Sequence, residues 1–125
     1  MKKLLLATVL LALACPAHSA DHPKLPTEAL GVWCMKKAGK PVSTYVRGNC
    51  WRKDEYAIAI GSDNYKGWEM DCKMVKIVAG KDSYTMEYRC AGEAFTWSES
   101  VTVKMPDFNT LVMVLNKTWG EKRDD

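Results

Sequence analysis

The chain has 125 residues, with 18 Lys and Arg against 15 Asp and Glu and a formal net charge of +3. This length accommodates one domain, and so small a charge does not indicate a nucleic-acid partner. The two His leave little scope for His-based catalysis or a His-rich metal site. The five Cys are odd in number, so one of them needs a separate explanation.

The first twenty residues have the pattern of a secretory signal. Lys2 and Lys3 precede residues 4–14, which are all apolar or Thr. These eleven residues would rise about 16 Å as a helix, too short for a hydrocarbon core of ~30 Å. We therefore expect residues 1–20 to be a signal peptide, the protein to be periplasmic or secreted, and the chain to have no transmembrane segment.

The cleavage point stays open, because small residues allow a cut after Ala17, Ser19 or Ala20. Residues 13–15 also resemble a bacterial lipoprotein box, although Ala12 stands where an aliphatic residue is usual. In that alternative Cys15 carries lipid and anchors the protein. In either case the odd cysteine belongs to export and not to the folded domain.

The four remaining cysteines are Cys34, Cys50, Cys72 and Cys90. An exported chain folds in an oxidising compartment, so an even number of cysteines predicts two disulfides. Four cysteines allow three connectivities, and the sequence does not decide between them. Pairing Cys34 with Cys50 and Cys72 with Cys90 is the first choice on proximity alone.

The rest of the chain divides into a leader, residues 21–29, and a single β-domain, residues 30–125. The leader is polar and contains prolines, so we expect it to be flexible. In the domain, apolar and polar residues alternate with period 2, and the alternating runs are residues 55–60, 68–74, 83–91 and 93–105, with an apolar run at 111–115. Turn-forming residues separate the runs. The pattern predicts an all-β fold, a small antiparallel meander barrel or tight sandwich of about seven or eight strands.

One predicted hairpin contains both Cys72 and Cys90. Its apolar residues stay on one face only if a bulge lies beside Val75. With the tip at residues 80–81, Cys72 faces Tyr88 and lies diagonal to Cys90. Diagonal neighbours are too far apart for easy closure, so a bridge between these cysteines would require a shift of register.

The five Trp divide by their position in the pattern. Trp33, Trp68 and Trp97 lie on apolar strand faces, where large aromatic residues fill the core of a small barrel. Trp51 and Trp119 flank turns or ends, where exposure is more plausible. Aromatic residues at the mouth of a barrel would instead form a ligand site.

The sequence contains few of the groups that enzymes need. His18 and His22 lie outside the domain body, the cysteine spacings do not match a zinc site, and no Gly-rich phosphate loop is present. We predict a non-enzymatic protein without metal or cofactor. Glu99 is the unusual acid, because it shares a strand face with Trp97 and Val101 and should point inward. A buried carboxylate is costly unless it is paired.

Charge is uneven along the chain. Residues 29–53 contain six basic residues and no acidic one, interleaved with aromatic residues. Such a stretch can bind an anionic or sugar-containing surface through charge and stacking. The alternative is two solvated loops beside strands whose aromatic residues lie in the core. The candidate surface consists of Lys36, Lys37, Lys40, Arg47, Trp51, Arg52 and Lys53.

A resemblance adds to this picture. The opening Gly31-Val32-Trp33-Cys34, with Tyr45-Val46-Arg47, Cys50 and Cys90-Ala91-Gly92-Glu93, resembles small exported bacterial proteins of unknown function that begin Gly-x-Trp-Cys. The likeness covers about residues 30–97 and implies an exported β-domain without a known activity. The Gly-x-Trp alone also resembles lipocalin-like small β-barrels, although this chain is too short for a deep calyx.

We therefore predict a monomeric, exported binding module whose ligand is unidentified, with an anionic envelope component as one possible class of partner. The alternative is a periplasmic inhibitor of a hydrolase, a lysozyme or a protease, which would act by occluding the active-site cleft. The two hypotheses differ in what occupies the candidate surface.

Overall fold

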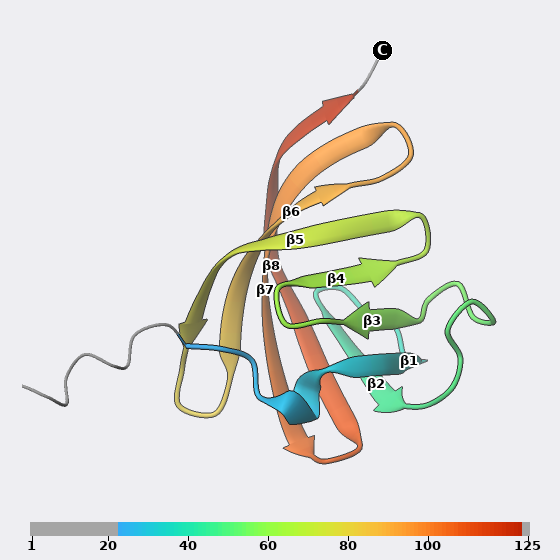
Figure 1. Cartoon of the computed structure of the whole chain (residues 1–125), viewed down its shortest axis with the longest axis vertical. Coiled ribbons are helices and arrows are strands. Elements are labelled where there is room, and N and C mark those ends of the chain that lie inside the picture. The colour runs from blue at the N-terminus through green and yellow to red at the C-terminus, as the bar shows by residue number, and fades with distance from the viewer. Residues whose placement is uncertain (1–22, 124–125) are drawn as a thin grey trace, which may run out of the picture.

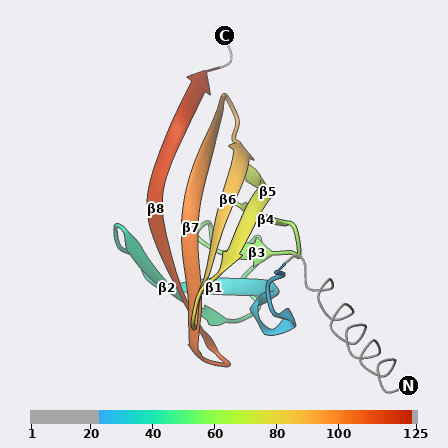
Figure 2. The same cartoon turned by 90° about the vertical axis from the view of Figure 1, so that its left-hand side faces the viewer.

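The computed structural model describes residues 23–123 and is a closed barrel of eight antiparallel strands (Figures 1 and 2). A short 3-10 helix, η2 (Thr27–Ala29), precedes β1 (Gly31–Lys37), β2 (Val42–Arg47), β3 (Ile58–Ile60), β4 (Asn64–Gly67), β5 (Met70–Ala79), β6 (Tyr84–Ala91), β7 (Phe95–Asp107) and β8 (Thr110–Arg123). The predicted all-β barrel is thus confirmed. The predicted signal peptide, its cleavage site and Cys15 lie outside the described residues. Within those residues, no helix has the length and apolar character needed to cross a bilayer.

The order of strands around the barrel is β1-β2-β8-β7-β6-β5-β4-β3. Strands β3 to β8 form a meander, and the β1–β2 hairpin closes the barrel between β3 and β8. Because β2 and β3 are both antiparallel to β1, they run in the same direction, and the connection between them must cross over β1. This connection, residues 48–57, is held there by a disulfide from Cys50 to Cys34 of β1.

Alternate residues of each strand fill the barrel, as the period-2 pattern predicts. An eight-stranded barrel is just wide enough for its interior to be filled by side chains. Its buried core combines aromatic, aliphatic and sulfur-containing residues: Leu25, Trp33, Tyr45, Ile58, Ile60, Tyr65, Cys72, Met86, Tyr88, Cys90, Val101, Val103, Leu111 and Met113.

Trp33 and the segment before β1 close one end of the barrel. Leu25 and Ala29 are buried, and the Trp33 indole donates a hydrogen bond to the Ala29 carbonyl at 2.9 Å. The Arg47 guanidinium lies over the Trp33 ring at 4.4 Å and over the Phe108 ring at 4.1 Å. Within the stretch expected to be a flexible leader, residues 21–29, the side chains of Leu25 and Ala29 thus pack on the barrel.

The β5–β6 hairpin corrects the predicted register. The bulge lies between Met74 and Lys76, as predicted. The tip is longer than assumed, however: Ala79 faces Tyr84, and four residues form the turn. The register shifts by two residues, so Cys72 faces Cys90 directly, and the disulfide between them forms. Both disulfides of the first-choice pairing are confirmed.

Trp68, which the pattern predicts to face the core, is exposed instead, and so is Tyr56. Trp68 is 58% exposed because β4 and β5 are joined by a tight turn with Trp68 and Glu69 at its tip. Tyr56 is 59% exposed because β3 begins only at Ile58. The other predictions for tryptophan agree better: Trp33 is buried, and Trp97 packs against the core.

Candidate functional site

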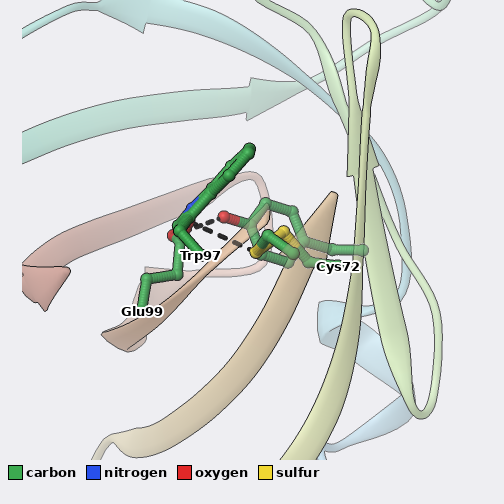
Figure 3. The surroundings of a disulfide bond; sticks show 5 residues. Cys72, Trp97 and Glu99 are labelled. Carbon is green, nitrogen blue, oxygen red and sulfur yellow. Dashed lines mark hydrogen bonds between the residues drawn. A yellow bond between two sulfur atoms is a disulfide. The ribbon is translucent and has the colours of Figure 1, made fainter. Parts of the chain in front are cut away.

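Glu99 of β7 is a buried acidic residue in the interior of the barrel. Its side chain is 7% exposed and points inward, as its position in the pattern predicted. The Tyr65 hydroxyl donates a hydrogen bond to Oε2 at 2.7 Å, and the Trp97 indole donates one to Oε1 at 2.9 Å. Figure 3 shows Trp97 and Glu99 beside the disulfide of Cys72. Two neutral donors therefore satisfy part of the carboxylate, which can accept about four hydrogen bonds.

The neighbouring disulfide does not turn this cluster into a metal site. Cys72, Cys90 and Glu99 place their ligand atoms within 4.8 Å of one another. Both sulfur atoms are bonded to each other, so neither is the thiolate that binds a metal. The Cys90 sulfur carries no hydrogen, and its 3.4 Å approach to Glu99 is therefore a packing contact and not a donated hydrogen bond.

Three tyrosines lie near the carboxylate, and their pKa values depend on its charge. Burial raises the pKa of Tyr45, Tyr65 and Tyr88, and the negative field of Glu99 raises each pKa further. The Tyr65 and Tyr88 rings meet edge to face, with centroids 4.7 Å apart. The hydroxyls of these tyrosines therefore stay protonated at neutral pH and remain available as hydrogen-bond donors.

These raised pKa values predict a loss of stability in alkali. Below about pH 9 the tyrosines are protonated in both the folded and the unfolded chain, so they add no pH dependence. Above about pH 10 the unfolded chain loses these protons first, so the free energy of unfolding falls, by up to ~1.4 kcal/mol per pH unit for each group. Urea unfolding at several pH values between 8 and 11 measures the slope. Tyr88→Phe should make the slope shallower, and an unchanged slope would contradict the assignment.

A second site lies on the outside of the barrel. The β2–β3 connection and the β4–β5 turn form an open pocket of about 490 Å³, called here the outer pocket. It brings together side chains from two segments that are distant in sequence: Trp51, Arg52, Asp54 and Ala57 from the connection, and Gly67, Trp68 and Glu69 from the turn. Two indole rings, two carboxylates and one guanidinium thus line one cavity.

Local geometry holds the β2–β3 side of the outer pocket in place. The Cys50 carbonyl accepts hydrogen bonds from the amides of Lys53 at 2.8 Å and Asp54 at 3.0 Å, and Cys50 is also bonded to β1. The Asp54 carboxylate accepts a bond from the Tyr56 amide at 2.9 Å. These contacts make a compact loop whose shape is set before any ligand arrives.

Backbone strain is concentrated at the same pocket. Arg52 has φ 68° and Glu69 has φ 52°, values that belong to the left-handed region and are uncommon for residues other than Gly. Both residues line the outer pocket. Such conformations cost about 1–3 kcal/mol each and cluster at sites of function.

The structure separates the predicted basic surface into parts. Trp51 and Arg52 line the outer pocket, whereas Lys53 is exposed on the same connection. Lys40 lines another pocket, and Arg47 is engaged between rings, where its Nε donates to the Phe108 carbonyl at 2.8 Å. Lys36 and Lys37 are exposed at the end of β1.

Sequence reasoning missed the other half of the outer pocket. The alternating pattern predicts a strand through Trp68 and Glu69, although the preceding Gly67 is a residue that also indicates a turn. Asp54 and Ala57 carried no signal of their own. Their approach to Trp68 depends on pairing between strands that only the folded barrel defines.

Comparisons with family models, with curated proteins and with solved structures find no match for this chain. The resemblance to exported Gly-x-Trp-Cys proteins and to lipocalin-like barrels stays a prediction. Function must therefore be argued from the chemistry of the two sites, since a barrel fold alone does not imply one.

Proposed function

We propose that this protein is an exported, non-enzymatic binding module, and that its outer pocket holds a saccharide. The observation that carries the proposal is the meeting of Trp51 and Trp68, from separate segments, in one open cavity of about 490 Å³. Trp68 is 58% exposed. Its large aromatic ring can therefore bury apolar surface against the apolar face of a bound ligand.

The chemistry of the lining favours a sugar over a lipid or a simple anion. The indole rings offer faces with partial negative charge, which attract the slightly positive C–H groups of a pyranose ring. Arg52 donates hydrogen bonds, and the carboxylates of Asp54 and Glu69 accept them from hydroxyls. One basic and two acidic residues do not create the strongly positive surface that an anionic partner requires.

Export is supported by the covalent structure. Two disulfides join Cys34 to Cys50 and Cys72 to Cys90. Such crosslinks persist in oxidising compartments and are rare in the cytosol. Together with the signal-like pattern of residues 1–20, they favour a periplasmic or secreted protein whose ligand is a glycan of the cell envelope.

Binding to neutral oligosaccharides of glucose and of N-acetylglucosamine, followed by tryptophan fluorescence, tests the proposal. We expect Trp68→Ala to weaken the affinity about 30-fold, since truncating an aromatic anchor costs about 2 kcal/mol or more. Trp119→Ala is the matched control, because Trp119 lies away from the outer pocket and should not change the affinity. The absence of any sugar-dependent change in the wild-type protein would contradict the proposal, and release of reducing ends would contradict its non-enzymatic part.

A specific feature supports hydrolase inhibition as a second candidate. The β2–β3 connection is pinned by the Cys34–Cys50 disulfide and presents Tyr56 to solvent. A preordered loop with an exposed aromatic residue is suited to occluding a cleft. In this alternative the protein inhibits a lysozyme or a protease in a direct assay, Tyr56→Ala relieves the inhibition, and no free saccharide binds.

A further inference from the structure

A separate pocket opens into the barrel interior beside Glu99. Its volume is about 190 Å³, and we call it the inner pocket. It lies between the β1–β2 hairpin and the inward faces of β2, β7 and β8, and its lining residues are Gly39, Lys40, Pro41, Ser43, Tyr45, Glu99, Val101, Met113 and Leu115. None of them lines the outer pocket.

The carboxylate at the base of the inner pocket has no cationic partner within the described part of the chain. Its hydrogen bonds come from the Tyr65 hydroxyl and the Trp97 indole, which are both neutral. No Lys or Arg side chain among residues 23–123 donates a hydrogen bond to Glu99. A buried charge is costly unless an opposite charge accompanies it. A bound cation would therefore lower the free-energy cost of burying the Glu99 carboxylate.

The remaining walls suit an organic cation better than a hydrated ion. Val101, Met113 and Leu115 make one side apolar, and the Tyr45 ring provides an aromatic surface. Aromatic faces attract ammonium groups within about 6 Å of the ring centre. The only basic residue in the lining is Lys40, which is exposed, so that water screens its charge.

Size limits the occupant. A volume of about 190 Å³ corresponds to about six water molecules at ~30 Å³ each, and hence to a ligand of about six non-hydrogen atoms. We propose that the inner pocket binds a small alkylammonium ion, with its charged nitrogen on Glu99 and its alkyl group against Val101, Met113 and Leu115. This inference does not rest on the saccharide proposal, because the two pockets share no residue.

Isobutylammonium is a suitable probe, with isobutanol as the neutral analogue and isovalerate as the anionic one. The Trp97 indole N–H is bonded to Glu99 and reports on the site, so its resonance in ¹H–¹⁵N spectra should shift on titration. We expect isobutylammonium to shift it saturably and the other two compounds to leave it unchanged. Equal binding of isobutanol, or no shift with isobutylammonium, would overturn the proposal.

Glu99→Gln retains the side-chain shape and one acceptor oxygen while removing the charge. We expect it to weaken isobutylammonium binding about 10- to 100-fold, the range for loss of a hydrogen bond to a charged group. Glu87→Gln is the matched control, since it makes the same change on the neighbouring strand β6 and away from the inner pocket, and it should not alter the affinity. Unchanged binding by folded Glu99→Gln protein would refute the inference.

If Glu99→Gln does not fold, Ser43→Leu decides the question. Ser43 lines the inner pocket, and its hydroxyl donates to the Gly39 carbonyl and not to Glu99, so we expect a leucine there to fill the cavity and leave the carboxylate's hydrogen bonds intact. The inference requires this variant to lose isobutylammonium binding while its far-ultraviolet circular dichroism spectrum and its urea unfolding transition show that it is folded. Retained isobutylammonium binding by Ser43→Leu would place the cation elsewhere and overturn the proposal.

Discussion

Replacing Trp33 with Ala is expected to lower the free energy of unfolding by about 3–5 kcal/mol, the usual range for removing a large aromatic residue from a core. Trp33 is 0% exposed and is the largest fully buried side chain of the barrel. Its truncation also leaves the Ala29 carbonyl without the indole donor. In addition, the Arg47 guanidinium loses one of the two rings between which it lies.

Urea unfolding followed by far-ultraviolet circular dichroism measures this effect without depending on tryptophan emission. Trp119→Ala makes the same chemical change at a residue that is 38% exposed, so it should cost about 0.5 kcal/mol or less. Equal costs for the two variants would show that Trp33 does not close the barrel end as described.

Removing the Cys72–Cys90 disulfide is the second large effect. The chain-entropy model gives about 3 kcal/mol for each crosslink, because the two disulfides span separations of 18 and 16 residues. Cys72 and Cys90 are also buried in the core beside Glu99. Replacing both with Ala leaves a cavity there and adds to the entropic cost. We therefore expect this double variant to be less stable than the double variant of Cys34 and Cys50.

The Cys34–Cys50 variant provides the comparison, and its main consequence should be local. Without that bond the β2–β3 connection loses its covalent attachment to β1. The backbone hydrogen bonds between the strands of the barrel remain. Hydrogen exchange should then rise selectively at residues 48–57, and saccharide affinity at the outer pocket should fall. If this variant proved the less stable of the two, the assignment of the core disulfide would be contradicted.

Much of the barrel was predictable because the pattern of apolar and polar residues within each strand shows which side chains face inward. Period-2 alternation reports which residues of a strand share a face, and this pattern identified the strands. The same parity placed Glu99 inside, where its carboxylate accepts hydrogen bonds from the neutral Tyr65 and Trp97 side chains. The count of cysteines, together with the expectation that the chain is exported, predicted two disulfides.

The predictions that failed concern turns, because the sequence does not show the length of a turn and that length sets which residues of the two strands face each other. A hairpin tip of four residues, in place of two, moved Cys72 from Tyr88 to Cys90, because a shift at the turn changes every pair in the ladder. Trp68 fits the alternation of a strand, yet a tight turn between β4 and β5 exposes it. Sequence alone could not supply either turn geometry.

Sequence by itself determined the all-β class, the inward position of Glu99 and the number of crosslinks, since these follow from side-chain chemistry and strand parity. Only the tertiary structure decided that β1 lies between β2 and β3, which sends residues 48–57 across the barrel wall to meet the β4–β5 turn. The outer pocket and the inner pocket both depend on contacts between segments distant in the chain. Such contacts are set by the closure of the whole barrel, and no local pattern encodes them.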